Sequence, residues 1–108
     1  MATSTLSETD RGRTIHVRSG DLVVISLAEN PTTGYRWAVD PPASHLLVEL
    51  SSELEPAVVS GVGGGGRRRL TYRAVQSGTA RLSLTLRRAW EAAGLGIDHY
   101  EVAIEIGI

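Results

Sequence analysis

Cysteine is absent from the 108-residue sequence. Its absence excludes disulfide bonds, thiolate metal ligands and a cysteine nucleophile, but it does not decide the compartment, because secreted domains can also lack cysteine. A large net charge is missing too. The formal net charge is −1, so no global electrostatic field draws the chain to nucleic acid or to a membrane. No apolar stretch reaches the roughly 18 to 20 residues that span a bilayer.

The N-terminal stretch MATSTLSETDRGRT lacks the apolar run of a signal peptide. This composition fits a cytoplasmic protein, and it equally fits the mature form of a secreted or periplasmic protein. We expect residues 1–13 to be a flexible polar N-terminus and residues 14–108 to form one domain, which is the usual unit at this length. Nothing in the sequence requires more than a monomer.

Candidate residues for catalysis, metal binding and cofactor binding are also missing. His16, His45 and His99 have no partner at a ligand spacing, and no serine lies in a nucleophile elbow. The glycine run at 61–66 matches the pattern G-x-G-x-x-G, but the residues after it resemble a strand, and no lysine completes a P-loop. We therefore predict no catalytic residue, no metal and no cofactor.

The arginine run at 67–69 lacks the interleaved aromatic side chains of a nucleic-acid platform. The sequence therefore favours a solvated strand end at these three residues, and neither nucleic acid nor a membrane is an expected partner.

Hydrophobic residues alternate with polar ones at period two along most of the chain, which is typical of half-buried strands. No helix pattern is convincing, so the chain reads as an all-β, two-sheet antiparallel sandwich of about seven to eight strands, although the composition would also permit a small barrel. The expected strands lie near 15–18, 22–27, 35–39, 45–50, 70–74, 80–87 and 99–106, with a short edge segment at 58–59.

Two strand details are specific enough to test. In the 45–50 strand, alternation places Leu46, Val48 and Leu50 on one face, and we expect the polar stretch 51–56 to be a connection. Trp37 belongs to the core in this interpretation, because sandwiches often bury a tryptophan on their third strand. Trp90 lies in a polar, glycine-flanked segment and is expected to be exposed.

The segment NPTTGYRW at 30–37 contains more specialised residues than a simple reversal needs. Asn30-Pro31 starts a turn, proline fixes its own φ, and Gly34 can adopt conformations closed to other residues. Thr32 and Thr33 would then lie at the tip of a stiffened loop. In an immunoglobulin-like wiring, this loop would share one end of the sandwich with the glycine run and with the connection after residue 88.

The motif NPTTGY, then a GxGG-type run, then Arg-x-Trp, in this order, resembles the chagasin-type inhibitors of papain-like cysteine proteases. The resemblance implies an immunoglobulin-like β-sandwich whose first loop (30–35), glycine loop (61–66) and third loop (88–91) block the protease cleft. The residues that it assigns to protease binding are Asn30, Pro31, Thr32, Thr33, Gly34, Tyr35, Gly61, Gly63, Gly64, Gly65, Gly66, Arg88 and Trp90.

The resemblance also implies a role for each loop. Thr32 and Thr33 would approach the catalytic cysteine, the glycine loop would follow the non-primed side of the cleft, and Arg88 with Trp90 would pack on the primed side. Two features depart from the family pattern: Ala89 stands where the family has proline, and the glycine motif fits either 61–64 or 63–66.

A rival interpretation retains the same loops and changes the partner. An immunoglobulin-like module could use them to bind another protein or a glycan. Protease titration separates these two interpretations, and hydrolysis of generic substrates would indicate an enzyme.

Overall fold

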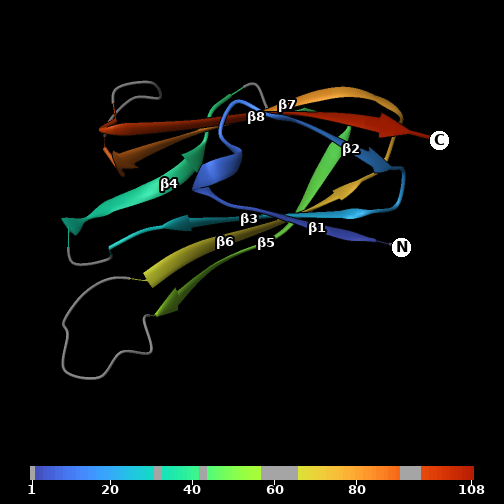
Figure 1. The fold of residues 1–108 in the computed structure, drawn as a ribbon. Helices are drawn as coiled ribbons and strands as arrows, with labels where there is room; N and C mark the ends of the chain where they lie inside the picture. Colours follow the sequence, from blue (N-terminus) through green and yellow to red (C-terminus); the bar gives the residue numbers. More distant parts are fainter. Residues whose placement is uncertain (1, 31–32, 42–43, 57–65, 91–95) are drawn as a thin grey trace.

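The computed structural model describes residues 2–30, 33–41, 44–56, 66–90 and 96–108. Within these residues, strands account for almost all regular structure, and they form two sheets that pack face to face (Figure 1). The elements are β1 (Thr3–Leu6), η1 (Glu8–Asp10), β2 (Thr14–Arg18), β3 (Leu22–Ala28), β4 (Tyr35–Val39), β5 (Leu47–Pro56), β6 (Gly66–Ala74), β7 (Gly78–Arg88) and β8 (Asp98–Gly107).

Each sheet has four strands, in the orders β1-β3-β6-β5 and β2-β8-β7-β4. The four central and C-terminal pairings, β3–β6, β5–β6, β4–β7 and β7–β8, are antiparallel. The pairings β1–β3 and β2–β8 are parallel, so the N-terminal segment adds one edge strand to each sheet. The predicted β-sandwich is confirmed, and the barrel alternative is wrong because the two sheets do not close on each other.

The core lies between the sheets and follows the predicted period of two. In β8 the side chains of Tyr100, Val102, Ile104 and Ile106 are buried, and those of Glu101 and Glu105 are exposed. Trp37 is 6% exposed within this core, as predicted. β3 is buried on both faces over much of its length, which explains why its sequence is almost continuously apolar.

The N-terminal segment differs from the flexible tail expected at residues 1–13. Residues 3–6 form β1, Leu6 is buried in the core, and the Tyr100 hydroxyl donates a hydrogen bond to the Ser7 carbonyl at 3.0 Å. Burial raises the pKa of Tyr100 to about 12, so the hydroxyl keeps its proton at neutral pH. The sandwich therefore begins before residue 14. The sequence composition did not reveal β1, because an edge strand with one solvent-exposed face consists mostly of polar residues.

β5 also differs from its prediction. The strand runs from Leu47 through the segment expected to be a connection, with a bulge between Glu49 and Ser51. Leu47 is buried, whereas Val48 and Leu50 are 46% and 48% exposed. Val48 and Leu50 therefore share one face, as predicted, but this face is exposed. Because Leu46, Leu47 and Val48 are all apolar, alternation alone could not tell which face enters the core. The predicted edge segment at 58–59 lies outside the described residues.

The strand registers bring three chain connections to one end of the sandwich, which we call the loop end. β3, β5 and β7 finish there, and β4, β6 and β8 begin there, as Figure 1 shows. In the pairing registers, Ala28 lies opposite Arg67, Pro56 opposite Gly66, and Tyr35 opposite Arg88. The first loop, the glycine loop and the third loop therefore leave the same end of the molecule, as an immunoglobulin-like wiring predicts.

Candidate functional site

The first loop is held by hydrogen bonds within its own backbone and side chains. The Thr33 amide donates to the Asn30 carbonyl at 3.2 Å, and the Thr33 hydroxyl donates to the same carbonyl at 2.8 Å. The Tyr35 amide donates back to the Thr33 hydroxyl at 3.3 Å. Gly34 has φ = +80°, a conformation that suits glycine. Pro31 and Thr32 lie outside the described residues.

Directly beneath this loop lies a buried ion pair that the sequence analysis missed. The Arg68 guanidinium donates through Nη2 to Glu29 Oε2 at 2.8 Å and through Nε to both carboxylate oxygens. The Trp37 backbone amide donates to Glu29 Oε1 at 2.7 Å, and the Trp37 indole donates to the Ala28 carbonyl at 2.9 Å. Glu29 and Arg68 thus connect the ends of β3 and β6 with β4.

The prediction of a solvated arginine run is wrong for Arg68 and agrees with the exposure of its neighbours. Arg67 pairs with Glu8 at 2.6 Å and Arg69 with Glu55 at 3.4 Å, and these side chains are about half exposed. The signal for Arg68 was present in the sequence. It falls in phase with Leu70, which is buried, so alternation alone points its side chain inward.

The Glu8 carboxylate makes a further hydrogen bond at the loop end. Its Oε2 accepts the Ala28 amide at 2.9 Å, at the last residue of β3. Burial acts to raise the pKa of Glu8, but the hydrogen bonds from Arg67 and from the Ala28 amide outweigh burial and lower the pKa below its ordinary value. Glu8 is therefore a carboxylate at neutral pH, and it ties the N-terminal 3-10 helix to the end of β3.

Of the predicted glycine-loop residues, only Gly66 is described; Gly61, Gly63, Gly64 and Gly65 lie outside the described part. Gly66 opens β6, and its carbonyl accepts the Glu29 amide at 3.1 Å. A Cβ placed on Gly66 would lie 2.7 Å from the Glu55 carbonyl oxygen, closer than real Cβ contacts. Strand packing by itself therefore requires glycine at this position.

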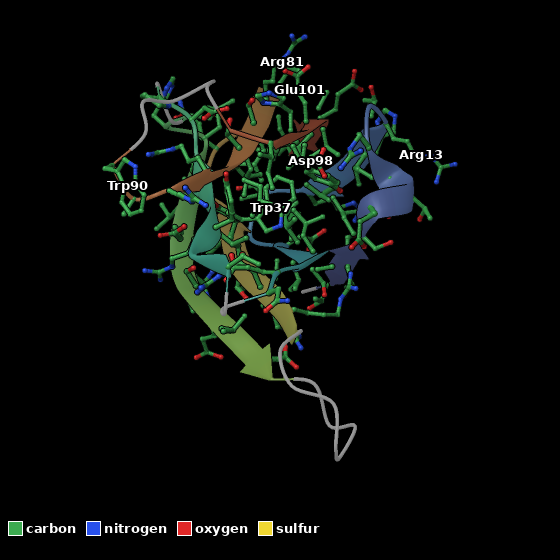
Figure 2. All side chains as sticks on the ribbon, turned by 90° about the vertical axis from the view of Figure 1, so that its left-hand side faces the viewer. Arg13, Trp37, Arg81, Trp90, Asp98 and Glu101 are labelled. Carbon is green, nitrogen blue, oxygen red and sulfur yellow. The ribbon has the colours of Figure 1, made fainter. Side chains whose placement is uncertain are left out.

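The start of the third loop is a stack of three side chains. The Arg88 guanidinium carbon lies 4.7 Å from the centroid of the Tyr35 ring and 5.6 Å from that of Trp90. Trp90 is 78% exposed, as predicted, and Figure 2 shows it at the margin of the molecule, far from the interior Trp37. The stack joins the first loop to the third, because Tyr35 and Arg88 also pair across β4 and β7.

Gly96, which the sequence analysis did not single out, packs against β7 just before β8 begins. A Cβ on this residue would overlap the Leu86 carbonyl oxygen, and the Ile97 amide donates to that oxygen at 2.9 Å. Gly96 therefore brings the returning chain against the end of β7. Residues 91–95 lie outside the described part of the chain.

One cluster on sheet β2-β8-β7-β4 combines residue types found in enzymes. The Thr85 hydroxyl lies 2.8 Å from both Asp40 carboxylate oxygens and 3.4 Å from His99 Nδ1. Thr85 is fully buried, so its hydroxyl cannot reach a substrate, and the cluster is a structural network. Among the residues described, no group of acidic and histidine side chains could hold a metal ion, and no helix could cross a membrane.

Known proteins of similar sequence and structure share this fold. Residues 16–104 match the model of the family described as chagasin family peptidase inhibitor I42. Amoebiasin-2 of Entamoeba histolytica is 31% identical over 87 residues, which cover 80% of this chain and 71% of that protein. Chagasin of Trypanosoma cruzi is 28% identical over 106 residues, covering 93% and 94%. The crystal structure of the cysteine protease inhibitor EhICP2 from Entamoeba histolytica superposes with a TM-score of 0.87 at 25% identity, covering 98% and 96%.

Proposed function

Since this chain belongs to the chagasin family of peptidase inhibitors, we propose that it binds papain-like cysteine proteases reversibly and tightly and blocks their active-site cleft. The proposed contacts come from the first loop, the glycine loop and the third loop. The observation that supports this proposal best is the meeting of the ends of all three loops at one end of the sandwich.

The first loop has the properties that a reversible inhibitor needs. A protease cleaves an extended backbone, whereas the chain here bends at Gly34 and bonds to itself through Thr33. The bend keeps the peptide out of a cleavable pose. Because the hydrogen bonds of Thr33 with Asn30 and Tyr35 are present in the free inhibitor, less conformational entropy is lost at these residues in the complex. We propose that Thr32 and Thr33 approach the catalytic cysteine of the protease.

The third loop supplies the aromatic anchor. Trp90 has a large, exposed and amphipathic ring, the kind of side chain that dominates interface energies. Arg88, stacked between Tyr35 and Trp90, restrains the ring from one side. We propose that Trp90 and Arg88 pack on the primed side of the cleft and that the glycine loop follows the non-primed side, where residues without Cβ permit close backbone contact.

Titration of active-site-counted papain with this protein tests the proposal. We expect nanomolar inhibition, with the inhibitor recovered uncut by intact-mass measurement after prolonged incubation. No inhibition at micromolar protein would overturn the proposal. It would favour the rival module that uses the same loops to bind another protein or a glycan.

A further inference from the structure

We propose that Glu29 and Arg68 are positioning residues for inhibition: their buried ion pair fixes the end of β3, where the first loop begins, relative to the start of β6, where the glycine loop ends. This inference rests on the proposed function, because it assigns how two of the inhibitory loops are oriented. Neither residue is expected to contact the protease, since their side chains are only 1% and 7% exposed.

Glu29 lies where it can contact both ends of the first loop. Glu29 immediately precedes Asn30, where the first loop begins, and its own amide donates to the Gly66 carbonyl at 3.1 Å. Its carboxylate accepts the Trp37 amide at 2.7 Å, just beyond the other end of the same loop. One residue therefore joins both ends of the first loop to the end of the glycine loop.

Arg68 contacts both Glu29 and the strand that precedes the glycine loop. It lies two residues after Gly66, and its guanidinium forms three hydrogen bonds with the Glu29 carboxylate, of which the shortest is 2.8 Å. Its Nη1 also lies 3.4 Å from Ser52 Oγ on β5, the strand that enters the glycine loop. The guanidinium thus contacts the strand before the glycine loop and, through Glu29, the start of the first loop.

The Glu29–Arg68 site is buried, yet it is occupied by two charged side chains rather than by two apolar ones. Two apolar side chains of similar size in a buried site often stabilise a protein as well as an ion pair does, because both ions lose their hydration. An apolar contact has no preferred direction, whereas a planar guanidinium and a carboxylate meet in a fixed geometry. The pair therefore contributes orientation between two loops, and preorganised loops bind with a smaller entropic loss.

The neighbouring pair Arg67–Glu8 provides a contrast within the same strand. It is short, at 2.6 Å, but both side chains are more than two-fifths exposed. Water can replace most of what that pair supplies. Arg67→Met is therefore a matched control for the loss of an arginine from the start of β6.

The test compares the double variant Glu29→Gln/Arg68→Met with two controls, Arg67→Met and Ile104→Val. The double variant removes both charges, retains an oxygen for the Trp37 amide and leaves no isolated buried ion. Ile104→Val lowers stability from the fully buried middle of β8, away from the loops. Each variant is measured for its inhibition constant against papain, its melting temperature, and the amide exchange of Thr33 and Trp37 without protease.

We expect the double variant to remain folded and to raise the inhibition constant by about tenfold or more, with faster exchange at Thr33 and Trp37. Ile104→Val and Arg67→Met should stay within about twofold of the wild type, as expected for changes that leave the binding loops in place. An unchanged inhibition constant in the double variant would overturn the proposal. So would an equal loss in Ile104→Val at the same melting temperature.

Failure of the inference is distinguishable from failure of the proposed function. If the wild type does not inhibit papain, the proposed function is wrong, and the exchange rates still decide whether the pair orders the loops. Unchanged exchange at Thr33 and Trp37 in the double variant would then overturn the positioning role by itself.

Discussion

At the residue scale, the loop end depends on side-chain contacts both within a loop and between neighbouring loops. Arg88 stacks between the rings of Tyr35 and Trp90, and the Thr33 hydroxyl bonds twice within the first loop. Exposed aromatic rings are normally mobile, but a guanidinium packed on one face reduces that freedom. Contacts within the inhibitor thus hold Thr33, Tyr35 and Trp90 in place before any protease binds.

Trp90→Ala should weaken papain inhibition more than any other single change in the loops. Loss of a central aromatic anchor typically costs about 2 kcal/mol or more, and we expect most of it as faster dissociation. Stopped-flow association and displacement experiments measure the two rates. Val75→Ala, an exposed apolar residue at the opposite end of the sandwich, is the control, and equal losses in both variants would contradict the prediction.

Thr33→Ala should weaken inhibition less than Trp90→Ala does. The change removes the hydroxyl that bonds the Asn30 carbonyl and the Tyr35 amide, and each such bond contributes about 0.5–1.5 kcal/mol net. The inhibition constant against papain is the measurement. A loss larger than that of Trp90→Ala would show that Thr33 makes a dominant contact of its own in the complex.

Ala89→Pro should tighten inhibition modestly. Arg88 ends β7 in an extended conformation, which the residue before a proline prefers, so proline can be accepted without strain in that residue. A proline that fits the bound backbone narrows the conformations of the free loop, so less conformational entropy is lost on binding. The inhibition constant should fall by a few-fold, and a rise would indicate that the native Ala89 backbone does not fit proline.

At the element scale, the strand ends carry the loops, and glycine permits the closest of their contacts. β5 and β6 meet at Pro56 and Gly66, where the chain leaves for the glycine loop and returns. The N-terminal elements support the same end, since Glu8 in η1 accepts the Ala28 amide at the last residue of β3. Elements from both halves of the chain therefore hold the loops in place.

Gly66→Ala should destabilise the protein and weaken inhibition together. The added Cβ would lie 2.7 Å from the Glu55 carbonyl oxygen, and backbone must shift to relieve this contact. Such overpacking typically costs about 1–3 kcal/mol of unfolding free energy. Chemical denaturation and papain titration measure both effects. Gly107→Ala is the control, because its nearest contact would be an ordinary 3.8 Å.

At the scale of the whole molecule, carboxylates near the N-terminus link stability to pH. Hydrogen bonds from the Ala2 and Arg18 amides lower the pKa of Asp21, and the Ser7 amide lowers that of Asp10. A lowered pKa in the folded state stabilises the protein above the unfolded-state pKa. This stabilisation is lost as pH falls through the lower folded-state value.

Stability should therefore be constant around neutral pH and decline below about pH 4, near the ordinary pKa of an aspartate. Asp21→Asn should lower the melting temperature at pH 7, and the difference from wild type should shrink as the pH falls toward 2. Thermal unfolding at several pH values measures both curves. A difference that persists unchanged in acid would show that the Asp21 charge is not responsible.

The sequence by itself determined the sandwich class, most of the strands and buried faces, and the positions of the connecting loops. Period-two alternation is a local consequence of burying one face of a strand, and Asn-Pro and Gly34 encode a turn through their own backbone preferences. The exposed Trp90 and the buried Trp37 could likewise be assigned from their neighbours along the chain. The binding roles of the loop residues remain predictions.

Only the tertiary structure decided the N-terminal strand, the bulge in β5 and the partner of Arg68. Each depends on residues distant in sequence: β1 needs β3 beside it, the bulge needs the register of β6, and Glu29 lies 39 residues before Arg68. Alternation indicates which way a side chain points, but it does not identify the side chain that it contacts there. A buried charge is tolerated only beside its counterion, and that proximity is created by the packing of strands, which no local pattern encodes.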